Sequence, residues 1–198
     1  MEVTQGRKEV PEALREAAFE TTIGYEAEMQ GIVTAYNLSV VEVSTLKEHR
    51  ADGIELNAHK VYHAALDAGI EYRPFVNGDV SALPEGHPLA ALKVSRASEE
   101  SVVEDVLAIQ SALGVPVLTV DHLYYELDGA PLAERESLTN VLRRVSEHEE
   151  IGFHSTKELI LEHGLEVALE DSNHYRSAFE RLVAERMHDS IRSMYALM

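Results

Sequence analysis

Residues 98–129 read SEESVVEDVLAIQSALGVPVLTVDHLYYELDG and contain the clearest helix and the clearest strand of the chain. Ser98 is a favourable N-cap, and two glutamates follow it in the first turn. Apolar residues then recur at helical spacing until Gly114, which suits the position just after a helix. The apolar run Val115–Val120 predicts a buried strand. A helix followed by a strand indicates a mixed fold.

The regions on either side of this stretch are predicted to be mostly helical. Apolar residues recur every three or four positions over Pro11–Tyr36 and again toward the C-terminus, which predicts a long helix at each end. A capping box at Thr45 predicts another helix that ends at Gly69. We therefore expect one α+β or α/β domain over 1–198, mostly helical, with the terminal helices around a sheet of about three to five strands. Within it, segment 1–37 is an N-terminal helix that extends from the domain or packs across it.

Composition excludes several classes of site. The 198 residues include 17 Lys and Arg against 35 Asp and Glu, for a net charge of −18, and no Cys. The lack of Cys excludes disulfides, Cys-ligated metals and thiol nucleophiles. The acidic surplus disfavours general nucleic-acid binding and is typical of a salt-adapted or an ordinary acidic protein. We see no signal peptide and no membrane-inserting run, so we expect a cytoplasmic or particle-associated protein.

Histidines and glutamates provide the candidate metal ligands. Glu55, His59 and His63 are spaced by four residues, so on one helix they would share a face and suit Zn²⁺, Mn²⁺ or Fe²⁺. Glu185 and His188 form one Glu-x-x-His motif, whereas di-iron bundles use two. The competing interpretation of each set is a solvated polar face. No cofactor is expected on this reading, and a divalent metal is the alternative.

Asp121 and His122 follow the predicted strand directly. Ligands bind at the carboxyl ends of strands in open α/β sheets, so this pair is a candidate site, although a turn also tolerates both residues. The sequence contains no GxxxxGK[ST], GxGxxG or GxSxG motif.

The stretch Gly114–Gly129 resembles the Val-Pro strand and following hairpin of thioredoxin-like folds. This resemblance implies a cis peptide bond before Pro116 and a helix over 131–150. It also implies that the hairpin or a sheet edge holds a partner. Because the family's Cys-x-x-Cys motif is absent, the resemblance implies a binding domain without redox chemistry.

The striped terminal helices and the absence of catalytic motifs favour a non-enzymatic assembly or adaptor subunit. Its partners would be protein subunits in a homo- or hetero-oligomer, such as a virus particle connector or tail from a salt-adapted source. The alternatives are a metal-dependent enzyme with a His/Glu site and the thioredoxin-like binding domain. Partner contacts are predicted for apolar residues of the terminal helices, namely Leu14, Tyr25, Met29, Tyr36, Met187, Ile191 and Met194.

Overall fold

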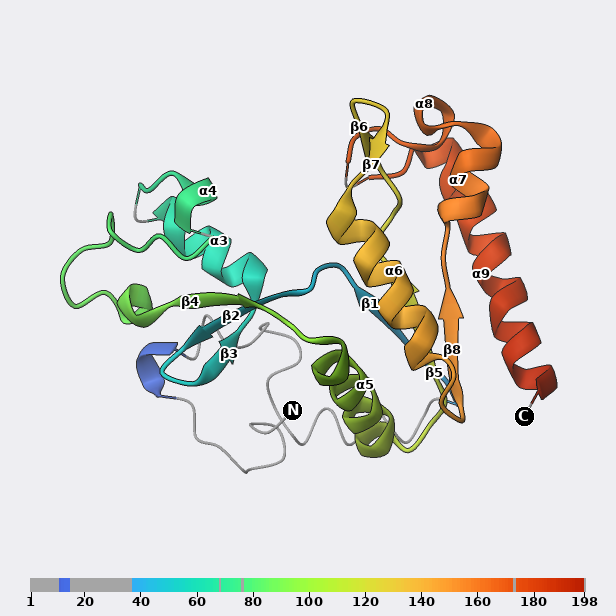
Figure 1. Cartoon of the computed structure of the whole chain (residues 1–198), viewed down its shortest axis with the longest axis horizontal. Coiled ribbons are helices and arrows are strands. Elements are labelled where there is room, and N and C mark those ends of the chain that lie inside the picture. Colours follow the sequence, from blue (N-terminus) through green and yellow to red (C-terminus); the bar gives the residue numbers. More distant parts are fainter. Residues whose placement is uncertain (1–10, 15–36, 68, 76, 173, 198) are drawn as a thin grey trace. The chain divides into compact units, whose positions relative to one another are not determined.

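The computed structural model describes residues 11–14, 37–67, 69–75, 77–172 and 174–197 (Figure 1). These residues form two compact units, which are described separately. Unit 1 comprises Met1–Ala35 and Lys47–Ala97, and unit 2 comprises Tyr36–Leu46 and Ser98–Met198. Helices occur with small sheets, which confirms a mixed α+β chain. The expectation of a single domain stays a prediction.

An antiparallel sheet forms the centre of unit 1, with strand order β3-β2-β4. The strands are β2 (Lys47–Ala51), β3 (Ile54–Leu56) and β4 (Lys93–Arg96). The remaining elements of this unit are η1 (Glu12–Leu14), α3 (Ala58–Asp67), α4 (Tyr72–Phe75) and η2 (Pro88–Ala91). The strand predicted over residues 70–76 is therefore wrong, because α4 occupies that segment.

The predicted helix between Thr45 and Gly69 is wrong in its first half. Asp52 and Gly53 have φ angles of 51° and 73°, the left-handed values that a two-residue hairpin turn requires. This turn joins β2 to β3, so the helix begins only at Ala58. An Asp-Gly turn therefore prevailed over a capping box at Thr45.

Apolar side chains from all parts of unit 1 form its core. Phe75, Val61 and Ala65 are fully buried, and Leu14 from η1 packs into the same cluster. Leu14 therefore serves the core of its own unit rather than an exposed stripe. The other residues of the predicted N-terminal helix, 15–36, lie outside the described part of the chain, and with them the candidate partner contacts Tyr25, Met29 and Tyr36.

A parallel sheet with strand order β1-β5-β8 forms the centre of unit 2. The strands are β1 (Ser39–Val43), β5 (Val117–Asp121) and β8 (Ile151–His154). All five residues of β5 are buried, as expected for a middle strand covered on both faces. The predicted strand at 115–120 is thus confirmed to within two residues.

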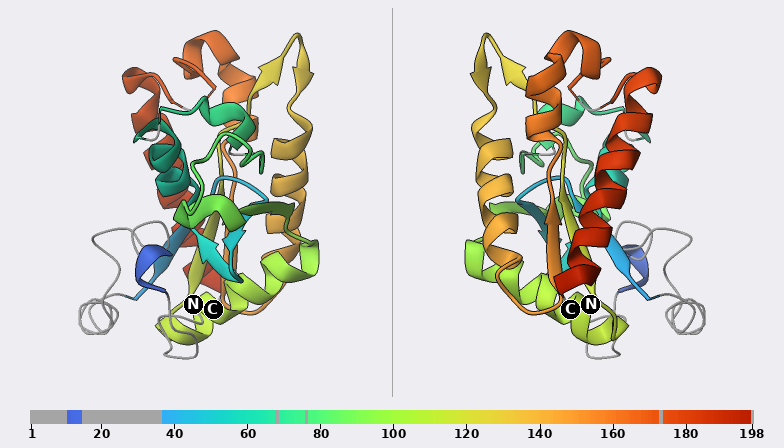
Figure 2. Two further views of the ribbon diagram at one scale, coloured as in Figure 1. Left: turned by 90° about the vertical axis from the view of Figure 1, so that its left-hand side faces the viewer. Right: turned by 90° about the vertical axis from the view of Figure 1, so that its right-hand side faces the viewer.

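Helices cover both faces of this sheet (Figure 2). α5 (Glu99–Leu113) and α6 (Ala133–Val145) contact each other and lie on one face, and the 21-residue α9 (Ser177–Leu197) lies on the other. α5 has the predicted cap, because Ser98 Oγ accepts a hydrogen bond from the Ser101 amide at 3.1 Å. Gly114 ends this helix with a φ of 63°.

The apolar stripe of α9 packs against its own sheet. Met194 joins Leu118 and Val120 in a buried cluster, and Met187 and Ile191 pack against the same cluster. These three α9 residues, predicted to contact a partner, thus have an intramolecular role. Gly152 of β8 lies beneath the helix, and a Cβ atom there would be 2.8 Å from the Met194 Sδ.

The smaller elements of unit 2 lie beyond the carboxyl ends of its strands. β6 (Glu126–Leu127) and β7 (Ala130–Pro131) form a hairpin, and α7 (Lys157–His163) and α8 (Leu165–Ala168) follow β8. The thioredoxin-like expectation is not met here. The Val115–Pro116 bond is trans, and β5 pairs with parallel strands on both sides.

Candidate functional site

Polar side chains gather at the carboxyl edge of the parallel sheet. β1, β5 and β8 all point the same way, so Glu42, Asp121, His122 and Ser155 lie at or just beyond the same edge. This is the position at which open α/β sheets bind ligands. The structure therefore places the predicted Asp121-His122 pair where the sequence argument expected a site.

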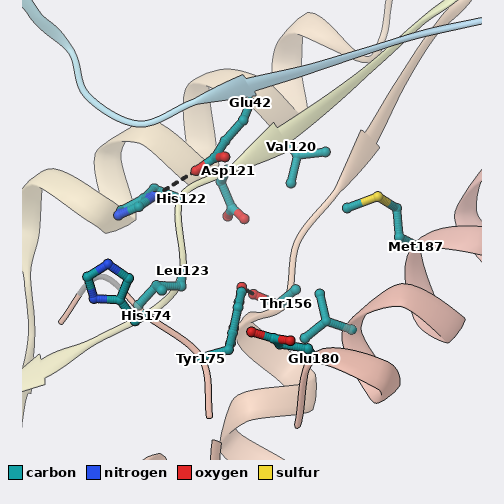
Figure 3. Close-up of a pocket in the computed structure, with 11 residues that line it drawn as sticks. Glu42, Val120, Asp121, His122, Leu123, Thr156, His174, Tyr175, Glu180 and Met187 are labelled. Carbon is teal, nitrogen blue, oxygen red and sulfur yellow. Dashed lines mark hydrogen bonds and ion pairs between the residues drawn. The ribbon is translucent and has the colours of Figure 1, made fainter. Parts of the chain in front are cut away.

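A cavity of about 320 Å³ opens at this edge (Figure 3). This volume is at the lower end of the range for small-molecule sites. The lining combines polar residues from the strand ends and the segment before α9 with an apolar wall from α9. The lining residues are Glu42, Val120, Asp121, His122, Leu123, Thr156, His174, Tyr175, Glu180, Val183 and Met187.

Asp121 is the most buried acid of the site, with 5 % of its surface exposed. Its Oδ2 accepts hydrogen bonds from Thr139 Oγ1 at 2.6 Å and from Ser155 Oγ at 2.8 Å. Its Oδ1 is buried and has no hydrogen-bond partner in the structure. Burial raises the pKa of this carboxyl, and the two hydroxyl donors offset only part of that effect. Buried carboxyl oxygens without a partner are rare in native structures, so Asp121 is a candidate functional residue of the site.

His122 is held by a carboxylate on the neighbouring strand. Its Nδ1 lies 2.7 Å from Glu42 Oε1, and the histidine side chain is only 17 % exposed. Val43 of β1 pairs with Asp121 of β5 in the sheet register. Glu42 precedes Val43 and His122 follows Asp121, so this pairing brings Glu42 and His122 together. The contact fixes the orientation of the imidazole ring.

His174 forms a second imidazole–carboxylate pair on the same cavity. Its Nδ1 lies 2.8 Å from Asp171 Oδ2, and this hydrogen bond, with the Asp171 charge, raises the pKa of the imidazole. The Glu170 amide donates a hydrogen bond to the His174 carbonyl at 2.9 Å. Leu169 and Tyr175 form an isolated antiparallel β-bridge. These backbone contacts hold the short segment that carries the pair just before α9.

Tyr175 lines the cavity and connects this segment to Thr156, which follows β8. Its hydroxyl is 2.7 Å from Thr156 Oγ1, and its ring stacks on Phe179 with centroids 6.1 Å apart. Burial raises the pKa of the phenol, so Tyr175 stays a neutral hydrogen-bonding group at ordinary pH. It contributes shape and polarity to the cavity rather than charge.

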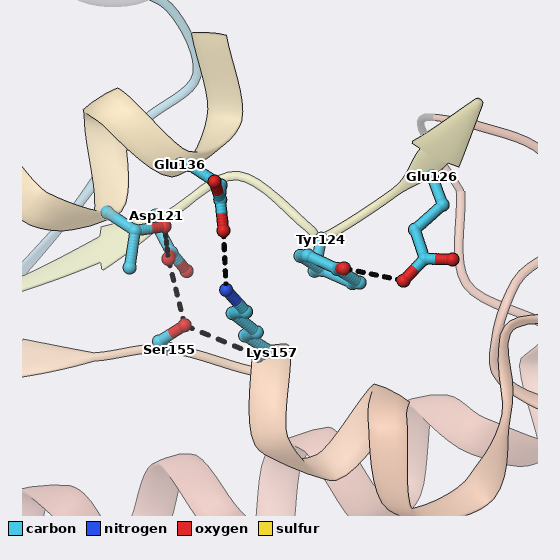
Figure 4. Close-up of polar contacts among 7 residues, drawn as sticks. Asp121, Tyr124, Glu126, Glu136, Ser155 and Lys157 are labelled. Atoms are coloured by element: carbon cyan, nitrogen blue, oxygen red, sulfur yellow. Dashed lines mark hydrogen bonds and ion pairs between the residues drawn. The ribbon is translucent and has the colours of Figure 1, made fainter. Parts of the chain in front are cut away.

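A polar contact chain lies beside the cavity, toward the β6–β7 hairpin (Figure 4). Lys157 Nζ is 2.9 Å from Glu136 and 5.0 Å from the centre of the Tyr124 ring. Tyr124 donates to Glu126 at 2.6 Å, and burial together with this contact raises its pKa to about 12. These contacts join the start of α7 to α6 and to the hairpin, so they fix the edge on which the cavity is built.

The structure separates Glu55 from the helix that carries the two predicted histidine ligands. Glu55 lies in β3, before the helix that carries His59 and His63, so the three do not share one helix as expected. His63 is exposed and packs edge-on against Tyr62. Among the residues that the structure describes, no group of three or more His, Asp or Glu side chains is placed to hold a metal ion.

The Glu-x-x-His motif of α9 points to solvent. Glu185 is exposed and lies 2.8 Å from Arg181 one turn earlier, and His188 is exposed as well. Both residues belong to unit 2, whereas Glu55, His59 and His63 belong to unit 1. The contact with Arg181 fits the alternative interpretation, a solvated helix face.

Comparison with known proteins assigns a family without assigning a reaction. The family model of the TviD N-terminal domain matches residues 79–190, more than half of the chain. The chain belongs to the TviD N-terminal domain family. The matched segment contains Asp121, His122 and His174, while Glu42 lies before it. No curated protein and no solved structure matches the chain.

The Asp171–His174 pair was missed in the sequence, which indicated only a break before the last helix. A usable signal was present, because the two residues are three positions apart and a long amphipathic helix follows them. Membership of the TviD N-terminal domain family does not by itself say what the pair does.

No helix in the described part of the chain has the length and apolar character needed to cross a membrane.

Proposed function

We propose that unit 2 is a hydrolytic or acyl-transfer enzyme that acts on an uncharged ester by general acid–base catalysis. One observation carries the proposal: two histidines bind carboxylates through Nδ1 and line the same cavity. Histidine is the most common general acid or base, and a carboxylate behind it fixes its orientation. The absence of familiar motifs favoured a non-enzymatic role, and this geometry is the reason to prefer an enzyme.

The charge of the cavity favours an uncharged substrate. Glu42, Asp121 and Glu180 all line it, and the chain carries a net charge of −18. Phosphate and carboxylate substrates would be repelled by these groups. A carboxylic ester carries no such charge, and its hydrolysis requires one group that removes a proton and one that returns it.

The proposed reaction assigns these tasks to the two histidines. His174 Nε2 accepts a proton from water as the water oxygen bonds to the ester carbonyl carbon, and the carbonyl electron pair moves onto its oxygen. When this intermediate collapses, the bond to the alcohol oxygen breaks and His122 donates a proton to that oxygen. The products are a carboxylic acid and an alcohol, and solvent restores both histidines. An acceptor alcohol in place of water would receive the acyl group by the same steps.

The experiment measures hydrolysis of p-nitrophenyl acetate and p-nitrophenyl phosphate by the full chain. We expect ester hydrolysis above the buffer rate, no phosphate hydrolysis, and a loss of about 100-fold or more in His174→Gln. His188→Gln is the matched control, since His188 is an exposed histidine outside the cavity. Equal rates for the two variants would refute the proposal.

The assembly role and the metal site predicted from the sequence stay predictions. Native mass spectrometry of the full chain, purified without chelator, measures subunit number and bound metal together. A defined oligomer would support an assembly role, and stoichiometric metal would redirect attention to the histidines of unit 1.

A further inference from the structure

We propose that Met187 determines the length of the acyl chain that the cavity accepts, so that its ester substrates carry short acyl groups. This role rests on the proposed ester chemistry and adds to it a residue that determines specificity. Met187 belongs to the α9 wall of the cavity and also packs against the buried cluster beneath that helix.

The cavity has a polar mouth and an apolar inner end. The His174 side chain is 70 % exposed, whereas Val120, which precedes the end of its strand, is only 7 % exposed. In Figure 3 the two histidines lie on one side of the cavity, and Val120 and Met187 lie on the other. An apolar chain is more stable away from water, so an acyl chain whose carbonyl lies at the histidines would extend toward Met187.

The α9 residues that line the cavity follow the same order. Glu180, Val183 and Met187 are spaced by three and four residues, so they share one face of the helix. Glu180 is exposed, whereas Val183 and Met187 are half-buried. Beyond Met187, the helix packs on the sheet through the contact of Met194 with Leu118. The Met187 side chain therefore separates the inner end of the cavity from that buried cluster.

The groups between the two ends suit an aliphatic chain. Thr156 Oγ1 and the Tyr175 hydroxyl lie 2.7 Å apart and satisfy each other. Figure 3 shows both side chains between the histidines and Met187. A polar group that already has a partner gains little from a second one, so this part of the cavity does not require a polar chain.

The size of the cavity limits the chain to a few carbon atoms. Its volume of about 320 Å³ must hold the reacting carbonyl group, the attacking water and the acyl chain. A longer chain can enter only if Met187 gives up its contacts with the buried cluster. One methylene more or less in a hydrophobic pocket changes kcat/KM by about 10- to 200-fold.

The experiment measures kcat/KM of the full chain for p-nitrophenyl acetate, butyrate and octanoate. We expect wild type to prefer the two shorter esters to octanoate by about 10-fold or more. Met187→Ala should raise the octanoate-to-acetate ratio by about 10-fold or more over wild type, because it opens the inner end. Met187→Phe should instead lower the butyrate-to-acetate ratio, because its rigid ring fills that end.

Ile191→Ala is the matched control. Ile191 lies four residues after Met187 and packs against the same buried cluster, but it is not a lining residue of the cavity. Its truncation should weaken the seating of α9 and leave the chain-length ratios at their wild-type values. An equal change in Ile191→Ala, or unchanged ratios in both Met187 variants, would overturn the role of Met187. Ester hydrolysis that still depends on His174 would then leave the proposed function intact.

A binding measurement that needs no reaction completes the test. The chain has five methionines, so ¹³C-methyl labelling gives few signals, and that of Met187 is identified by its absence in Met187→Ala. Butyramide is an uncharged mimic of a short acyl group. We expect it to shift the Met187 signal more than that of Met194, which is not a lining residue. An unshifted Met187 signal would refute the acyl site whether or not the chain hydrolyses esters.

Discussion

Gly152→Ala tests how α9 is seated on the sheet. The new Cβ would be 2.8 Å from Met194 Sδ and 3.0 Å from Leu118 Cδ1, about 1 Å closer than an ordinary carbon contact. The backbone at Gly152 is not in the left-handed region, so this steric conflict is the main cost. Overpacking costs about 1–3 kcal/mol, and we expect about 1–2 kcal/mol because the end of the Met194 side chain can shift.

Guanidinium unfolding followed by circular dichroism measures this loss. The expected change lowers the midpoint at unchanged slope, and it lowers Tm by about 2–8 °C. Val40→Ala, an exposed position on the same sheet, is the control and should stay within about 0.5 kcal/mol of wild type.

A double variant separates the steric conflict from other causes. Met194→Ala alone should cost about 2–5 kcal/mol by leaving a cavity above Gly152. Gly152→Ala should then cost nothing further, or restore part of the loss, because its methyl group fills that space. Strictly additive losses in the double variant would refute the proposed contact, since residues in direct contact are expected to couple.

Three further predictions concern unit 2. Leu142→Ala, at a fully buried position of α6, should cost about 2–5 kcal/mol in the same unfolding assay, and a loss near zero would contradict its place in the core. Ser98→Ala should cost about 1 kcal/mol by removing the cap of α5, whereas Ser98→Gly should cost less. Burial, with a smaller contribution from Arg186, lowers the pKa of His154 below its usual 6.5. Its contribution to stability is therefore present above about pH 6.5 and is lost as the pH falls toward the folded pKa, so wild type should lose more stability than His154→Gln between about pH 7.5 and pH 5.

Local signals were sufficient for part of the fold. The cap at Ser98, the stop at Gly114 and the apolar run after it determine α5 and β5 almost by themselves. The helix predicted from Thr45 failed because two local signals conflicted there. The Asp-Gly turn favours the β2–β3 hairpin locally, and the pairing of β2 with β4, which lies far away in the sequence, stabilises it further.

The candidate site was predictable only in part for the same reason. Asp121 and His122 could be placed at a strand end because strand and turn are adjacent in sequence. Their partners Glu42 and Thr139 come from other elements, 80 and 18 residues away in the chain. His59 and His63 were predicted to be metal ligands because of their spacing. Spacing does not show which side chains from other elements lie opposite them.

The order in which the chain is made gives the covering helix a further importance. β1, β5 and β8 leave the ribosome before α9, which supplies the apolar wall of the cavity and covers Leu118 and Val120. Until α9 docks, the nascent sheet exposes that apolar face and lacks part of its cavity. A chain arrested before α9 should therefore lack part of the cavity and be prone to aggregation, so completion of the cavity and protection from misassembly occur in the same step.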